Sequence, residues 1–225
     1  MSAAQGPVGP GPIGLLGGSF DPVHAGHLAL ARAAESALGL RQLLFLPAGQ
    51  PWQKPPLSPA PQRRDMLALA LGGHPGWQMD TRELERPGAT YTVDTLREIR
   101  AAAGPDIALV WILGSDQLRQ LSSWHAWERL LDLAHLAYAQ RPGAAEPLPP
   151  PLQAYVRQHQ GTPADLQYRP AGRLIEFAMT PVDCSSSRIR GELGAGVDTL
   201  ARRFLPAPVL DYVRSHSLYM AAHGQ

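Results

Sequence analysis

Apolar residues along the chain follow two patterns: short continuous runs alternate with longer stretches that have helical spacing. Continuous runs are typical of strands buried on both faces, and the longer stretches are typical of helices packed on one side. Predicted strands span residues 13–16, 43–46, 77–80, 107–113, 135–139 and 173–178, and predicted helices span 25–38, 62–71, 93–103, 123–133, 152–159, 186–193 and 207–216. Because strands and helices alternate, the sequence predicts an α/β fold, a parallel sheet with helices on both faces.

The predicted elements leave no linker long enough to divide the chain. Proline-rich loops are expected at residues 47–61 and 142–151, inside the alternating pattern. We expect residues 1–12 to be a flexible leader, residues 13–220 to form a single domain, and residues 221–225 to be a tail.

Composition narrows the class of protein. The chain has 225 residues, 44 % of them hydrophobic, which is ample for a core, and a formal net charge of +1. No Lys or Arg run exceeds a pair, so neither nucleic acid nor a membrane surface is an expected partner. The single cysteine, Cys184, cannot form an internal disulfide, and no export signal or membrane span is apparent. These features favour a cytoplasmic protein.

The segment at residues 17–27, GGSFDPVHAGH, lies between the first predicted strand and the first predicted helix. Gly17 and Gly18 allow a ligand to approach the backbone, and the N–H groups at a helix start favour a phosphate. His24 and His27 are three residues apart, so both rings can face one anion. This pattern indicates stabilisation of charge on a phosphorus atom that changes partners.

Other interpretations of the two histidines remain. A His-x-x-His pair can bind a metal, although no third ligand is evident, and two histidines at a helix start can also be surface caps. Their protonation is open as well, because the helix dipole opposes a positive charge whereas a polyphosphate favours it.

A second polar segment precedes the predicted helix at residues 186–193. Ser185, Ser186 and Ser187 supply hydroxyls next to helix N–H groups, and Arg188 and Arg190 add cations within one turn. This combination is typical of a polyphosphate cradle, although a plain serine cap with solvated arginines has the same pattern.

These segments together resemble the nucleotidyltransferase superfamily with an H-x-G-H motif, and most closely the nicotinate mononucleotide adenylyltransferases. Residues 17–27 resemble GG-x-F-D-P-x-H-x-G-H, and residues 184–190 resemble I-S-S-T-x-I-R, with Ser187 in place of Thr and Cys184, read as a small buried apolar residue, in place of Ile. Further blocks match at residues 85–92, 114–116 and 124–127, so the resemblance covers about residues 13–220.

The resemblance implies an α/β fold of the nucleotidyltransferase type, a Rossmann-like parallel sheet with helices on both faces, and a role for each matching residue. The expected catalytic residues are His24, His27 and Arg190, the last preferred over Arg188. The expected ATP-binding residues are Gly17, Gly18, Ser19, Phe20, Lys54, Arg141, Ser185, Ser186 and Ser187. The expected mononucleotide-binding residues are Asp21, Thr90, Tyr91, Thr92, Asp116, Trp124 and His125, with Trp124 stacking on the pyridine ring and Asp116 near ribose hydroxyls.

Several neighbouring residues have simpler interpretations. Lys54 matches the Lys of a loop over the nucleotide, but a Lys in a proline-rich loop is ordinarily solvated. Asp116 can be a helix N-cap, and Trp127 can belong to the core. Arg63 and Arg64 are expected to lie on the exposed face of their helix.

The expected reaction is transfer of AMP from ATP to nicotinate mononucleotide, which gives deamido-NAD and pyrophosphate. Magnesium is expected to arrive with ATP, held by phosphate oxygens and water rather than by protein ligands. The alternatives are an adenylyltransferase for nicotinamide mononucleotide or pantetheine phosphate, and a non-catalytic nucleotide-binding module on the same fold. Self-association into a homo-oligomer stays open.

Overall fold

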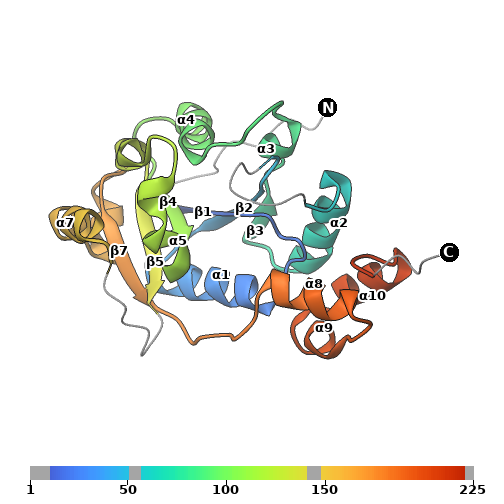
Figure 1. Cartoon of the computed structure of the whole chain (residues 1–225). Coiled ribbons are helices and arrows are strands. Elements are labelled where there is room, and N and C mark those ends of the chain that lie inside the picture. The colour runs from blue at the N-terminus through green and yellow to red at the C-terminus, as the bar shows by residue number, and fades with distance from the viewer. Residues whose placement is uncertain (1–10, 51–56, 141–147, 221–225) are drawn as a thin grey trace.

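The centre of the molecule is a parallel sheet of seven strands in the order β3-β2-β1-β4-β5-β7-β6 (Figure 1). The computed structural model describes residues 11–50, 57–140 and 148–220. The strands are β1 (Ile13–Gly18), β2 (Gln42–Pro47), β3 (Trp77–Met79), β4 (Leu109–Leu113), β5 (His135–Gln140), β6 (Gln160–Gly161) and β7 (Leu174–Ala178). Strand order reverses between β1 and β4, and ligands of open parallel sheets bind beside the carboxyl ends of strands at such a point.

Helices cover both faces of the sheet, as the sequence predicts. They are α1 (Ala25–Leu38), α2 (Ala60–Leu71), α3 (Arg82–Glu85), α4 (Thr92–Ala103), α5 (Ser115–Arg119), α6 (Leu130–Leu133), α7 (Pro150–His159), α8 (Ser186–Gly194), α9 (Thr199–Phe204) and α10 (Ala207–Ser215). The short 3₁₀ turns are η1 (Leu121–Ser123), η2 (Trp127–Arg129) and η3 (Pro163–Gln167).

Side chains that alternate along the strands build two cores. Leu16 of β1 packs with α1, α2 and the C-terminal helices, whereas its neighbour Leu15 packs on the other face with α4, α6 and α7. In β4, Ile112 belongs to the first core and Trp111 to the second. Period-two alternation on a doubly covered sheet explains why these strands are apolar throughout.

One predicted helix is wrong. Residues 123–133, expected as one helix, form η2 and α6 with Trp124 to Ala126 outside any helix. Ala126 has φ of +49°, a left-handed conformation that interrupts a right-handed helix. The structure also contains α3, β6 and α9, which are too short to produce a clear period and were not predicted.

Candidate active site

The start of α1 holds both predicted histidines in a fixed tautomer. The N–H of Gly26 donates to Nδ1 of His24 at 3.1 Å, and the N–H of His24 donates to Nδ1 of His27 at 3.3 Å. A ring nitrogen that accepts a hydrogen bond carries no proton, so each neutral ring carries its proton on Nε2. The two rings stack with their centroids 3.9 Å apart. The helix start therefore has two Nε2–H donors side by side.

His24 is buried, with 5 % of its surface exposed, and burial lowers its pKa to about 4. A hydrogen bond with its own backbone opposes this shift. The ring is therefore neutral at pH 7 in this structure.

The loop between β1 and α1 is shaped by close packing around its glycines. A Cβ atom at Gly17 would lie 2.5 Å from Cζ2 of Trp111, so only glycine fits beside this indole without a shift. Phe20 is fully buried with φ of +48°, and its ring packs edge-on against His27 with centroids 5.1 Å apart. Phe20 therefore supports a histidine and offers no side-chain surface to ATP.

The start of α8 lies against the same loop, although the two segments are far apart in sequence. Ser186 donates from Oγ to the carbonyl of Pro22 at 2.9 Å, and Arg190 donates from Nη1 to the carbonyl of Asp21 at 2.6 Å. The two predicted phosphate motifs thus form one unit. We call residues 17–27 and 184–190 together the phosphate end of the site.

Other residues of this motif have different environments. Ser185 caps α8, with Oγ accepting from the N–H of Arg188 at 3.3 Å, and its Oγ lies 3.2 Å from Oγ of Ser187. Arg188 is exposed and pairs with Asp183 at 2.7 Å. Cys184 is half-buried against the first core, and burial raises its pKa to about 11. Its thiol is therefore protonated at neutral pH.

Asp21 does not line the cavity described below. Its carboxylate accepts from the hydroxyl of Tyr219 at 2.6 Å and from the N–H of Ser58 at 3.1 Å, and the residue is 2 % exposed. Both oxygens have protein partners, so the expected direct contact with a mononucleotide has no support from this placement.

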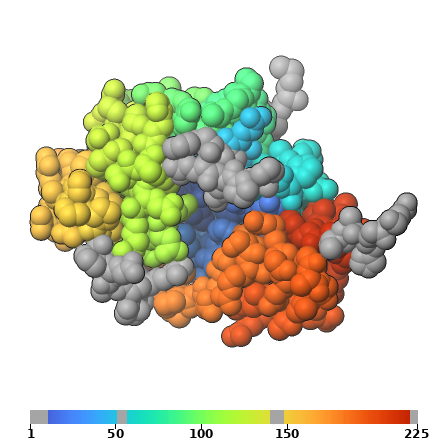
Figure 2. Space-filling model, in the orientation of Figure 1, coloured from blue at the N-terminus to red at the C-terminus, as the bar shows by residue number. Residues whose placement is uncertain are grey.

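A cavity of about 200 Å³ lies next to this loop, at the carboxyl ends of the central strands. Figure 2 shows a hollow with the blue N-terminal part of the chain at its floor and yellow-green residues on one side, and the orange residues on its other side do not line the cavity. Predicted residues that line the cavity are Gly17, Gly18, Ser19, Thr90, Tyr91, Thr92, Trp124 and His125. The structure thus brings the glycine loop, residues 90–92 and residues 124–125 to one place.

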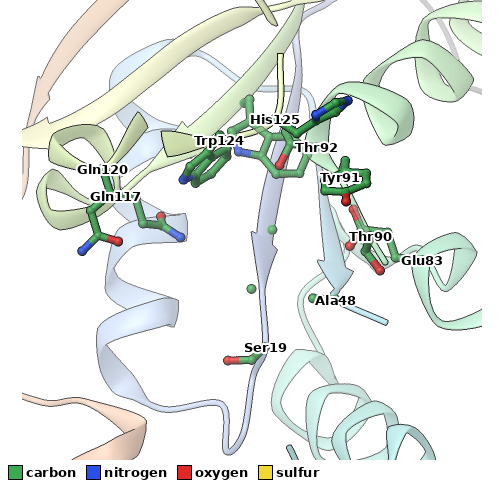
Figure 3. A pocket seen from close by; sticks show the side chains of 13 residues that line it. Ser19, Ala48, Glu83, Thr90, Tyr91, Thr92, Gln117, Gln120, Trp124 and His125 are labelled. Atoms are coloured by element: carbon green, nitrogen blue, oxygen red, sulfur yellow. The ribbon is translucent and has the colours of Figure 1, made fainter. Parts of the chain in front are cut away.

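The cavity has one aromatic end. Trp124 lies between the side of Gln117 and Gln120 and the side of Thr90 and Tyr91 (Figure 3). The rings of Tyr91 and His125 lie 4.5 Å apart, centroid to centroid. We call Tyr91, Trp111, Trp124 and His125 the aromatic end. Trp127 lies outside the cavity lining and packs edge-on against Tyr155, with centroids 4.7 Å apart, so the core interpretation holds for it.

Sequence reasoning missed five residues that line the cavity: Ala48, Glu83, Trp111, Gln117 and Gln120. Gln117 and Gln120 lie within four residues of the predicted Gly114-Ser115-Asp116 block. This short distance in sequence could have predicted that they line the same site. Oε1 of Gln117 accepts from the N–H of Gly114 at 3.1 Å. Trp111 lies inside an apolar strand, where nothing distinguishes it from a core residue.

Glu83 is a buried acid beside this cavity. Its Oε1 accepts from the hydroxyl of Thr95 at 2.7 Å, and that hydroxyl oxygen accepts from Arg86 at 3.1 Å. Burial raises the pKa of Glu83 to about 7, against the opposing effects of Thr95 and Arg86. The acid therefore titrates near neutral pH.

The predicted ligands of the substrates also include Asp116, Lys54 and Arg141. Asp116 is exposed in the first turn of α5 and does not line the cavity. Lys54 and Arg141 lie outside the described residues.

The prediction for Arg63 is wrong. It was expected on the exposed face of its helix, but it is 2 % exposed and points into the protein. Its neighbour Arg64 is exposed, as expected, and pairs with Asp65 at 2.8 Å. A long cationic side chain with enough backbone acceptors can be buried, and a helical pattern does not reveal those acceptors.

The donor set of the phosphate end is suited to anions rather than cations. Imidazole, hydroxyl, guanidinium and backbone N–H groups dominate there, and no group of three or more His, Cys, Asp or Glu within residues 11–50, 57–140 and 148–220 could hold a metal ion. Over the same ranges, no helix is both long and apolar enough to cross a membrane.

Comparison with known proteins defines the class first. Residues 15–192 match the family described as Cytidylyltransferase-like, so the chain belongs to this nucleotidyltransferase family. A "Probable nicotinate-nucleotide adenylyltransferase" of Laribacter hongkongensis is 49 % identical over 210 residues, which cover 92 % of this chain and 94 % of the relative. A protein of the same name from Bordetella pertussis is 43 % identical over 208 residues, or 92 % and 97 % of the two chains. Within its class, the chain is thus a member of the nicotinate-nucleotide adenylyltransferases.

Solved structures agree on the fold. The Plasmodium falciparum nicotinic acid mononucleotide adenylyltransferase complexed with NaAD aligns with a TM-score of 0.69 at 17 % identity, covering 93 % of this chain and 97 % of that one. The predicted fold class, family resemblance and enzyme class are therefore confirmed.

Proposed function

We propose that the protein transfers AMP from ATP to nicotinate mononucleotide, which gives deamido-NAD and pyrophosphate in NAD biosynthesis. The observation that carries this proposal is the pairing of two fixed Nε2–H donors at the start of α1 with an aromatic cavity beside the same loop. Adenylyl transfer to a pyridine mononucleotide needs donors for the phosphates of ATP next to a cavity for a flat ring. The names of the close relatives support the same reaction.

The reaction is an in-line displacement. A phosphate oxygen of the mononucleotide attacks the α-phosphorus of ATP, the bond from that phosphorus to the bridging oxygen breaks, and pyrophosphate leaves with the electron pair. No covalent enzyme intermediate is needed. Orientation of the two reactants can contribute about 7–11 kcal/mol to such a reaction.

The phosphate end supplies electrostatic stabilisation. His24 donates from Nε2 to the α-phosphate, where negative charge develops, and His27 donates to the neighbouring ATP phosphates. Ser185, Ser187 and Arg190 contact the β- and γ-phosphates, while the hydroxyl of Ser186 holds α8 on the loop. Within the part of the chain that the structure describes, Arg190 uses Nη1 for the carbonyl of Asp21, which leaves N–H donors for a phosphate.

The aromatic end holds the mononucleotide. Trp124 stacks on the pyridine ring, and backbone N–H groups near Thr92 and His125 donate to its carboxylate. Such donors satisfy a carboxylate and leave an amide NH₂ unpaired, so nicotinate is preferred over nicotinamide. Asp116 accepts from ribose hydroxyls at the end of β4, and Lys54 and Arg141 contribute cations to the ATP side.

A divalent metal ion accompanies ATP, and we propose Mg²⁺. The anion-type donors of the phosphate end fit an ion that is held by phosphate oxygens and water, and when bound it neutralises phosphate charge. The chain itself binds and orients the phosphates to which the ion is attached.

The test is a pyrophosphate-release assay with ATP and three acceptors: nicotinate mononucleotide, nicotinamide mononucleotide and pantetheine phosphate. We expect turnover with the first, at least tenfold weaker kcat/KM with the second, and none with the third. Turnover only with pantetheine phosphate, or ATP binding without any turnover, contradicts the proposal.

A further inference from the structure

Arg63 is a buried cation that holds several loops at once. Its Nε donates to the carbonyl of Ser58 at 2.9 Å, Nη1 donates to Ser19 at 3.1 Å and Ala48 at 2.7 Å, and Nη2 donates to Gly49 at 3.2 Å. Burial lowers the pKa of its guanidinium, and the charge of Asp21 opposes that shift. Four main-chain carbonyls from three chain segments thus converge on one side chain.

These contacts begin where the sheet stops. The parallel pairing of β1 with β2 ends at Gly18 and Pro47, and one more backbone bond, from the N–H of Ala48 to Gly18, follows it at 2.8 Å. Ser19 and Ala48 come directly afterwards, and both line the cavity. Beyond the end of the sheet, Arg63 therefore holds together the loop after β1 and the loop after β2, which form the cavity wall.

The loop after β2 is also held from its other side. The N–H of Gln50 donates to Oγ1 of Thr90 at 3.0 Å, and the N–H of Thr90 donates to the carbonyl of Gln50 at 3.1 Å. Gly49 lies so close to the carbonyl of Glu83 that a Cβ atom there would clash with it. Hydrogen bonds to Ala48 and Gly49 on one side and from Gln50 on the other thus connect Arg63 to Thr90 through the backbone of residues 48–50.

We propose that Arg63 is a positioning residue for the aromatic end of the active site, and that it acts through residues 48–50 on Thr90. The assignment of this end to a mononucleotide rests on the proposed function, whereas the mechanical link does not. A guanidinium carries five N–H donors in a plane and can satisfy carbonyls in several directions, which the single ammonium of lysine cannot do. Without these donors the carbonyls must turn toward water, and the wall moves.

The test compares Arg63→Met, which fills a similar volume without donors, with Arg63→Lys, which keeps the charge. Arg64→Met is the matched control, because Arg64 is adjacent, loses the same charge and is exposed. Hydrogen exchange at the backbone amides of residues 48–50 and 90 reports the link directly, without any substrate. Steady-state KM and kcat for both substrates report its effect on the reaction.

We expect Arg63→Met to speed exchange at residues 48–50 and 90 and to raise the KM for nicotinate mononucleotide about tenfold or more, with the KM for ATP changed less than about threefold. Arg63→Lys should fall between this variant and Arg64→Met. Equal exchange and equal KM values in Arg63→Met and Arg64→Met overturn the proposal, as does failure of both Arg63 variants to fold. If the wild-type protein releases no pyrophosphate, the proposed function fails, and the exchange data alone decide the role of Arg63.

Discussion

The phosphate end and the aromatic end of the site are built in different ways. At the phosphate end, the polar groups lie at the starts of two helices. Ser186 and Arg190 hold the start of α8 against the loop that leads into α1. At the aromatic end, rings from separate segments face a cavity, and hydrogen bonds behind them hold the wall. Two helix starts position the groups of the phosphate end, whereas separate chain segments position the rings of the aromatic end.

This difference predicts how each end responds to mutation. Under the proposed function, groups at the phosphate end contact atoms whose charge changes during the reaction, so we expect their loss to lower kcat or ATP binding. Under the same proposal, rings at the aromatic end contact a part of the substrate that does not change, so we expect their loss to raise KM.

The largest effect is expected for His24→Ala. Loss of a donor to developing charge typically costs about 2.7–4 kcal/mol, so kcat should fall by at least about a hundredfold while ATP affinity is retained. Pyrophosphate release and calorimetric ATP binding measure the two quantities. His24→Asn is the matched control for helix capping, because an asparagine can still accept from the N–H of Gly26 but lacks the Nε2–H, and it should be equally inactive. A kcat above a third of wild type would remove His24 from the mechanism.

The next effect separates two arginines of one helix. Arg190→Ala should weaken ATP binding by about 1.5–3 kcal/mol, which is the usual size of a charge-assisted contact. Arg188→Ala serves as the control, because Arg188 is exposed and pairs with Asp183. ATP dissociation constants for the two variants test this prediction. If Arg190→Ala weakens the mononucleotide and leaves ATP unchanged, the two ends have been assigned in the wrong order.

A comparable or smaller effect is expected at the aromatic end. Trp124→Ala should weaken nicotinate and nicotinamide mononucleotide alike, by about 1–3 kcal/mol, because stacking does not distinguish an acid from an amide of the same shape. The ratio of kcat/KM for the two substrates should stay near its wild-type value of about ten or more. A ratio that collapses in this variant shows that Trp124 itself selects the acid.

The smallest effect is expected for pH, because the two ends oppose each other. The pKa of His24 falls from 6.5 to about 4 on folding, so its contribution to the free energy of unfolding is present above pH 6.5 and is lost as pH falls toward 4. The pKa of Glu83 rises from 4.5 to about 7, so its contribution is present at low pH and is lost as pH rises through 7. Between about pH 5 and 6.5 the two slopes nearly cancel.

Glu83→Gln should reveal the pH dependence that His24 gives to the free energy of unfolding, because the opposing effect of Glu83 is removed. Its stability, measured by urea unfolding, should fall by on the order of 1 kcal/mol more than that of the wild type when pH is lowered from about 6.5 to about 5. Identical pH profiles for the two proteins show that Glu83 does not titrate in this range.

Local sequence determined most of the fold and the phosphate end. The helix at residues 25–38 matches α1 residue for residue, because its apolar spacing, its histidine cap and Gly39 all lie within one continuous segment. The glycine loop and the two histidines are contiguous in sequence, so their proximity could be predicted without a structure. Residues 123–133 show the limit, since their apolar period is helical but Ala126 adopts a left-handed conformation.

Tertiary structure alone decided what lies behind the site. The bond between Tyr219 and Asp21 joins residues 198 positions apart, and the burial of Arg63 depends on carbonyls from three separate segments. Periodicity reports only which face of an element is apolar, and it is blind to the partners that strand order brings to that face. A buried cation and an exposed one therefore look alike in sequence, as Arg63 and Arg64 do, until the path of the chain places acceptors around one of them.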